Sequence, residues 1–171
     1  MIQEYCRLKL SSLLRIVIPV SYVDEVVQLT PQDISPIAGV DPCLLGLTNQ
    51  RGSLLWVLHL EKFFGLQPSP LAKPIVAVTI HSQGQNGEIR RVACVVMALE
   101  DIVTFDSQKL LPLPAKLPSR AKNLLSGVVK LDKNAYGILN VNGVFQILNP
   151  DINPDIGRNQ AIATVASIST A

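Results

Sequence analysis

The 171-residue sequence predicts an all-β fold, and three observations support that prediction. Apolar and polar residues alternate with a period of two in several segments, which is typical of half-buried strands. Clusters of glycine, proline and asparagine separate these segments at short intervals, as turns do in β-sheet proteins. Segments with helical periodicity are rare. About ten short strands with little helix indicate a β-barrel or a β-sandwich.

The strands are predicted in chain order from these signals. Residues 6–10 alternate apolar and basic side chains, and residues 13–20 (LLRIVIPV) are rich in β-branched side chains. Residues 23–29 fit either a strand or a short helix, and the strand is favoured. The further predicted strands are residues 54–60, 75–80, 89–97, 102–105, 124–131, 136–141 and 144–148.

The connections are predicted from turn-forming residues. Residues 82–87 (SQGQNG) join a hairpin, because glycine and asparagine accept a positive φ. Residues 132–134 and 142–143 are predicted turns. A single helical turn is predicted over residues 61–64, and it ends at Gly65. Prolines predict irregular crossings over residues 30–40, 68–74 and 112–118.

The character of the chain changes after residue 149. The sequence NPDINPDIGRNQ is polar, and the sequence AIATVASISTA that follows is small and weakly apolar. We therefore expect one folded region over residues 1–149 and a C-terminal tail over residues 150–171 that is mobile or partly helical. The first ten residues mix charged and apolar side chains, so no signal peptide is expected. The longest apolar run, residues 92–99, is too short to span a bilayer.

Composition limits the possible functions. Hydrophobic residues make up 48% of the chain and charged residues 16%, which fits either a surface for partners or a large core. A net charge of +2 and an aromatic content of 5% argue against nucleic-acid binding. Cys6, Cys43 and Cys94 are far apart and lack zinc-ligand spacing. We expect reduced core thiols in a cytoplasmic protein, with no metal site and no cofactor.

The sequence also offers little for catalysis. His59 lies in an apolar predicted strand and His81 ends another, and a structural role is favoured for both. The glycines of residues 84–87 join two strands, whereas a phosphate-binding loop joins a strand to a helix. The acidic pairs at residues 24–25 and 100–101 are typical of solvated strand ends and form no acid–base pattern. No enzymatic activity is expected.

Residues 44–58 (LLGLTNQRGSLLWVL) place Asn49, Arg51 and Gly52 at a turn between two apolar flanks. This block, followed by an apolar strand, an acidic residue and a short helix, resembles the CheW family of bacterial chemosensory coupling proteins. Residues 23–26 (VDEV) are similar to that family's V-x-E-[IV] segment. The resemblance covers residues 3–149.

The resemblance implies two small SH3-like β-barrel lobes packed together around a shared apolar core. It implies a non-catalytic cytoplasmic adaptor, not inserted into the membrane, that couples methyl-accepting chemoreceptors to a CheA-type histidine kinase. The output is a taxis or pilus-motility pathway. Partner binding is expected at Val23, Glu25, Asn49, Arg51 and Gly52. An ion pair between Glu25 and Arg51 is expected at the edge of the partner groove, with the guanidinium presented at the junction of the lobes.

Alternatives stay open at this point. The chain could be a β-barrel that binds a small molecule or nucleic acid, with the Asn-x-Arg-Gly turn as an anion site. It could also be a CheW-like partner of another signalling protein. Arg51 could instead have a purely structural role, in which its ion pair only stabilises the fold.

Overall fold

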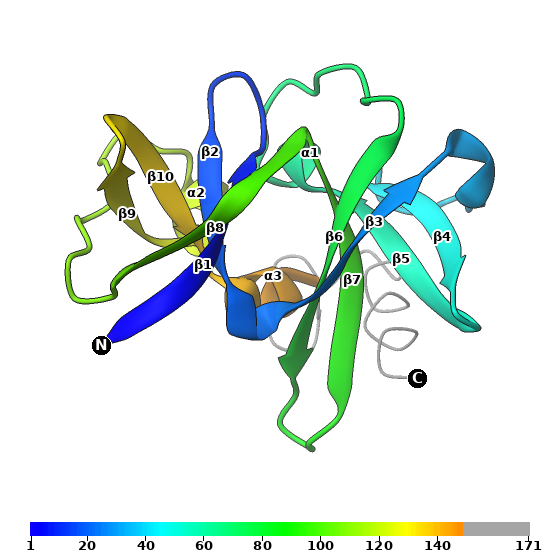
Figure 1. Ribbon diagram of the computed structural model, residues 1–171. Coiled ribbons are helices and arrows are strands. Elements are labelled where there is room, and N and C mark those ends of the chain that lie inside the picture. The colour runs from blue at the N-terminus through cyan, green and yellow to red at the C-terminus, as the bar shows by residue number, and fades with distance from the viewer. Residues whose placement is uncertain (149–171) are drawn as a thin grey trace.

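The structure is a computed structural model, and it describes residues 1–148. These residues form ten strands and a few short helices (Figure 1). The strands are β1 (Ile2–Lys9), β2 (Arg15–Pro19), β3 (Val23–Leu29), β4 (Leu44–Gln50), β5 (Ser53–His59), β6 (Ile75–Gln83), β7 (Ile89–Val96), β8 (Ala98–Asp106), β9 (Leu125–Leu131) and β10 (Asn134–Leu139). The helices are η1 (Val20–Tyr22), η2 (Pro31–Asp33), α1 (Leu60–Phe63), α2 (Ser119–Leu124) and α3 (Val141–Leu148).

The strands form two five-stranded sheets that lie side by side, with α3 between them (Figure 1). We call the sheet with the order β8-β1-β2-β10-β9 the first lobe, and the sheet with the order β3-β6-β7-β5-β4 the second lobe. In each lobe one parallel pair, β2–β10 or β5–β7, joins antiparallel neighbours. β3 follows β2 in the chain but belongs to the second lobe, and β8 follows β7 but belongs to the first. The two lobes are therefore intertwined.

Each sheet curls until the chain beyond one edge strand reaches the opposite edge. After β3, Ser35 exchanges two backbone hydrogen bonds with Leu47 of β4, at 2.7 and 2.9 Å. After β8, Leu111 does the same with Val128 of β9, at 2.7 and 3.0 Å. Gly46, with a φ of 143°, makes the first closure possible, because a Cβ there would overlap the Ser35 carbonyl group.

The largest cluster of buried apolar side chains draws on both lobes. Leu8 from the first lobe and Ile80 from the second are fully buried in it, as are Phe63 of α1 and Phe145 of α3. A smaller apolar cluster fills the interior of each lobe. Burial of this apolar area stabilises the pair of lobes as one unit. The expected architecture, two small barrels around a shared apolar core, is confirmed.

Some elements differ from the sequence-based expectations. The predicted strand at residues 144–148 and the predicted turn at 142–143 are wrong, because both segments belong to α3. Its buried residues Val141, Val144, Phe145 and Leu148 follow the helical spacing i, i+3, i+4 and i+7. Asn140 caps this helix, since its Oδ1 accepts a hydrogen bond from the Gly143 N–H at 3.0 Å.

The strand that was favoured over a helix for residues 23–29 is confirmed. β4 and α2 were not among the predicted elements. All three cysteines are free, and Cys6 and Cys94 are buried. Within residues 1–148, no helix has the length and apolar character needed to cross a membrane. The tail expected over residues 150–171 lies outside the described residues.

Candidate partner-binding site

The turn between β4 and β5 has a tight backbone conformation. Arg51 and Gly52 both have positive φ angles, of 54° and 85°, as in the two-residue turns that commonly connect the strands of a β-hairpin. Asn49 holds the turn, because its Oδ1 accepts a hydrogen bond from the Gly52 N–H at 2.9 Å. This conformation costs a non-glycine residue about 1–2 kcal/mol. The turn therefore keeps Arg51 in an unfavourable conformation with its side chain 86% exposed.

The predicted ion pair between Arg51 and Glu25 is present. The Arg51 Nη2 lies 3.2 Å from the Glu25 Oε2, and the Glu25 side chain is 29% exposed. Glu25 belongs to β3, which is one edge of the second lobe, and the Arg51 turn extends the opposite edge. The pair thus links two edges of one lobe, and the expectation that Arg51 lies at the junction of the lobes is wrong. An anion at this turn would compete with Glu25, which weakens the anion-site alternative.

More charged residues surround this pair at the same end of the second lobe. The Asp24 carboxylate lies 2.7 Å from the His81 Nδ1 and 3.1 Å from the Arg91 Nε. His81 and Arg91 are cross-strand neighbours in the β6–β7 hairpin. We call Asp24, Glu25, Arg51, His81 and Arg91 the charged rim. The acidic pair at residues 24–25 has the sequence pattern of a solvated strand end, and no local signal links Asp24 to residues on β6 and β7.

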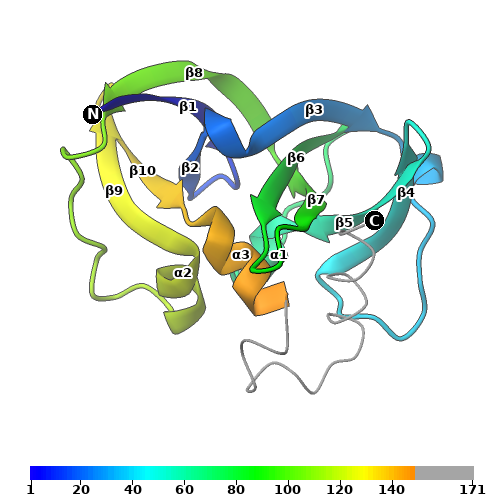
Figure 2. The ribbon, with the colours of Figure 1, turned by 90° about the horizontal axis from the view of Figure 1, so that it is seen from below.

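Val23 has a different environment from the charged rim. It is partly buried and packs against the shared core. Three apolar side chains farther along the two crossing strands remain exposed: Val26 on β3, and Leu99 and Ile102 on β8, at 39%, 42% and 56%. Both strands lie on the same side of the molecule (Figure 2).

These three side chains form the solvent-exposed margin of the shared core. Val26 is paired with Val78, Ile102 with Cys6, and Leu99 with Leu8, and each of these partners is buried in that core. Apolar side chains exposed at such a margin are typical of surfaces that bind another protein.

The first lobe is closed by a different arrangement of charges. Arg7 reaches from β1 to the carboxylates of Asp101 on β8, at 2.7 Å, and Asp132 in the β9–β10 turn, at 2.9 Å. Its side chain is only 13% exposed. Hydrogen bonds to these carboxylates raise the pKa of Arg7 well above its ordinary value. This cluster links both edges of the first lobe around a partly buried cation, so its role is structural.

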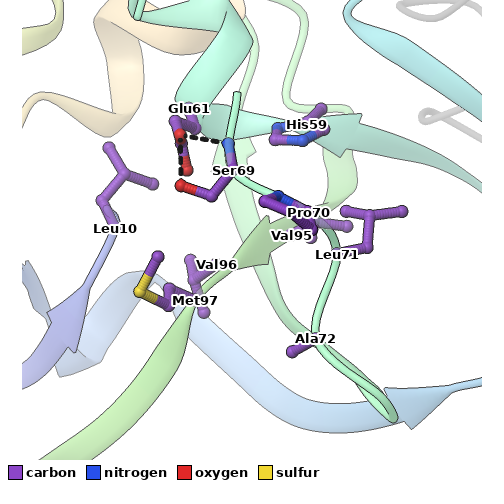
Figure 3. A pocket seen from close by; sticks show the side chains of 10 residues that line it. All are labelled: Leu10, His59, Glu61, Ser69, Pro70, Leu71, Ala72, Val95, Val96 and Met97. Atoms are coloured by element: carbon purple, nitrogen blue, oxygen red, sulfur yellow. Dashed lines mark hydrogen bonds between the residues drawn. The ribbon is translucent and has the colours of Figure 1, made fainter. Parts of the chain in front are cut away.

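A small cavity lies where β5 meets α1, and it is lined by His59, Glu61 and Ser69 (Figure 3). The buried Glu61 carboxylate accepts hydrogen bonds from the Ser69 N–H at 2.7 Å and from its Oγ–H at 3.0 Å. The cavity volume is about 20 Å³, which is enough for one water molecule but not for an organic substrate. Glu61 therefore holds the crossing segment at residues 68–74 in place through Ser69, and this role is structural.

The buried His59 makes the stability of the fold depend on pH. His59 is 5% exposed, and burial lowers the pKa of its imidazole, an effect that the nearby Glu61 charge only partly opposes. The unfolded chain therefore binds a proton below about pH 6.5 that the folded chain does not bind, so stability falls as the pH falls. We expect His59→Gln to reduce this slope, by at most about 1.4 kcal/mol per pH unit. Urea unfolding of both proteins between pH 7.5 and 5.5 measures it, and parallel curves would contradict the prediction.

A family model described as a CheW-like domain matches residues 8–149. A solved structure, the scaffolding protein TtCheW from Thermoanaerobacter tengcongensis, superposes with a TM-score of 0.71 at 20% identity. The alignment covers 85% of this chain and 94% of that one. At this identity the likeness concerns the fold. Comparison with curated proteins finds no match. Residues 1–148 contain no group of His, Cys, Asp or Glu that could hold a metal ion.

Proposed function

The chain belongs to the CheW-like domain family, and on this basis we propose that it couples methyl-accepting chemoreceptors to a CheA-type histidine kinase. The family is one of non-catalytic chemotaxis scaffolds, so the chain acts by holding partners together. Its place is the cytoplasm, where both partners present their signalling domains. The output is taxis or pilus-based motility.

The observation that supports this proposal best is the exposed Arg51 in its left-handed turn. An 86% exposed side chain paired with Glu25 contributes only about 0–1 kcal/mol to stability, which is less than the cost of the backbone conformation. A residue that stabilises the fold so little, yet is held in a fixed place, is well suited to contact a partner. Arginine is also enriched at the centres of protein interfaces.

The five residues expected to bind partners contribute in different ways under this proposal. Glu25 and Arg51 contact the partner through their charges. Asn49 and Gly52 act through the turn that positions Arg51, since the Asn49 oxygen is already bonded within the turn. Val23 acts by holding β3 against the shared core, beside the exposed Val26. The contact surface then combines the charged rim with the apolar margin.

Reconstitution tests the proposal. We expect the purified chain to co-purify with a CheA-type kinase and with a receptor signalling domain encoded near its gene. Receptor-dependent stimulation of kinase autophosphorylation should require the chain. Omitting the chain is the control, and phosphate should remain on the kinase and not move to His59 or His81. A chain that binds neither partner, or that accumulates phosphohistidine, would contradict the adaptor function.

A further inference from the structure

Strand β6 extends past the end of its pairing with β3. β3 begins at Val23, opposite Ile80, and the residues before it leave the sheet as the short helix η1. β6 itself continues to Gln83, at the tip of the β6–β7 hairpin, which projects beyond the neighbouring elements (Figure 1). Within residues 1–148, β6 has no strand neighbours other than β3 and β7. Residues 81–83 therefore lack a strand partner on the β3 side, and we call them the free edge.

The main chain of Gln83 points out of the sheet at this edge. The Gly84 N–H donates a hydrogen bond to the Glu88 carbonyl oxygen at 2.8 Å, so Gly84 bonds across the hairpin to the β7 side. In an antiparallel strand the main-chain N–H and C=O groups alternate between the two sides from one residue to the next. The N–H and C=O groups of Gln83 therefore point away from β7, towards the side that β3 occupies farther along the strand. A sheet edge of this kind can accept a strand from another chain.

A groove of about 500 Å³ runs along the free edge. Its lining includes Ser21 and Tyr22 of η1, His81, Ser82 and Gln83 of β6, and Asn142 of α3. Ser82 bonds to Asn142 on the α3 face of the hairpin, whereas its neighbours His81 and Gln83 face the opposite way, because side chains alternate along a strand. Side chains from both faces of the hairpin thus line one groove. The groove therefore lies at the edge of β6 and not over either face.

The lining suits an uncharged ligand that both donates and accepts hydrogen bonds. Among the described residues that line the groove there is no lysine, arginine, aspartate or glutamate. The Ser82 Oγ–H donates a hydrogen bond to Asn142 Oδ1 at 2.7 Å, which leaves the Asn142 N–H groups as donors. The His81 Nδ1 lies 2.7 Å from the Asp24 carboxylate and carries the proton between them, so Nε2 of the neutral imidazole is an acceptor. Ile89, which is 44% exposed, adds an apolar surface.

We propose that this groove binds an extended, uncharged segment of a partner protein, which adds to the free edge of β6 as a short strand. The segment pairs with the main-chain N–H and C=O groups of Gln83. A polypeptide main chain carries a donor and an acceptor at each residue and no charge, which matches the lining. His81 belongs to both the groove and the charged rim, so the two surfaces are continuous. The inference goes beyond the proposed function, because it requires neither the kinase nor the receptor.

The test uses the full chain and an uncharged peptide, acetyl-Thr-Val-Thr-Val-Thr-amide, whose residues favour an extended conformation. In a titration of the ¹⁵N-labelled protein, we expect the backbone amide of Gln83 and the side-chain amide of Asn142 to shift and to approach saturation. Two matched peptides are N-methylated, one at its valines and the other at its threonines. Because an added strand uses only one of its edges, one of them should bind like the unmodified peptide. The other should bind at least about tenfold more weakly, since it cannot form the main-chain hydrogen bonds.

Two substitutions of Gln83 separate main-chain recognition from side-chain recognition. Gln83→Pro removes the N–H group that faces the groove without removing a hydrogen bond to β7, and it is expected to lose peptide binding. Gln83→Ala keeps that N–H group and is expected to bind as the wild type does. Retained binding in Gln83→Pro, or loss in Gln83→Ala, would overturn the proposal.

The remaining outcomes are equally decisive. If Gln83→Pro does not fold, the two N-methylated peptides decide, and equal binding of both or binding of neither would overturn the proposal. A titration with the unmodified peptide that leaves the Gln83 amide unchanged would also overturn it. Sedimentation of the free chain identifies a different occupant: self-association that Gln83→Pro abolishes would assign the free edge to a second copy of this chain, against the proposal of a partner segment.

Discussion

Replacing Arg51 with glutamate is expected to leave the fold intact and to abolish binding of the kinase or the receptor. The Arg51–Glu25 pair spans 3.2 Å on a surface where Arg51 is 86% exposed, so its loss costs about 0–1 kcal/mol of stability. The melting temperature should therefore fall by only a few degrees. Truncating a charge buried in an interface costs about 2–5 kcal/mol of affinity, and reversal adds repulsion. Binding should weaken by a factor of about 30 or more.

Circular dichroism melting and a quantitative binding assay on the same preparation separate the two effects. The matched control combines Arg51→Glu with Glu25→Arg, which restores the ion pair with its charges exchanged. This double variant is expected to regain wild-type stability but not binding, because a partner meets the opposite pattern of charge. An Arg51→Glu protein that unfolds would make Arg51 structural. A protein that folds and binds both partners normally would remove Arg51 from the interface.

Replacing Gly46 with alanine is expected to give a much larger loss of stability. Gly46 has a φ of 143°, and an added Cβ would overlap the Ser35 carbonyl group and crowd Pro36. Relief of that overlap requires the backbone to separate at Ser35 and Leu47, whose two hydrogen bonds close the second lobe. Backbone strain of about 1–3 kcal/mol and the loss of about 1 kcal/mol per hydrogen bond add up to roughly 3–5 kcal/mol. The melting temperature should fall by roughly 10 °C.

Two glycine variants provide the controls for Gly46→Ala. Gly39 also has a positive φ, of 80°, but an added Cβ would meet no atom within 4 Å, so Gly39→Ala should cost only about 1–2 kcal/mol. Gly127 lies at the corresponding closure of the first lobe, where an added Cβ would be 3.4 Å from the Leu111 carbonyl oxygen. Gly127→Ala should be tolerated better than Gly46→Ala. Equal melting temperatures for Gly46→Ala and Gly39→Ala would show that the Ser35 closure is not rigid.

Local sequence patterns predicted most strands correctly, but they did not predict helix α3. Period-two alternation and β-branched residues predicted β2 and β3 correctly, because these preferences act within a strand. Residues 144–148 were misassigned because a short apolar run fits a strand and a helix equally well. The Asn140 side chain that caps α3 was the local signal that could have resolved this ambiguity.

The sequence alone determined the turn at Arg51 and, through its resemblance to the CheW family, the pairing of Arg51 with Glu25. Residues 49–52 form this turn from their own φ preferences and one side-chain hydrogen bond, so no distant contact is needed. Only the tertiary structure decided where that pair lies, because β3 and β8 cross between the lobes and bring together edges that are far apart in sequence. The curling of the first sheet joins Arg7 of β1 to Asp132 in the β9–β10 turn across 125 positions. Burial likewise depends on how distant segments pack and not on the order of neighbouring residues: Arg90 of β7 is 7% exposed because it packs against Phe145 of α3.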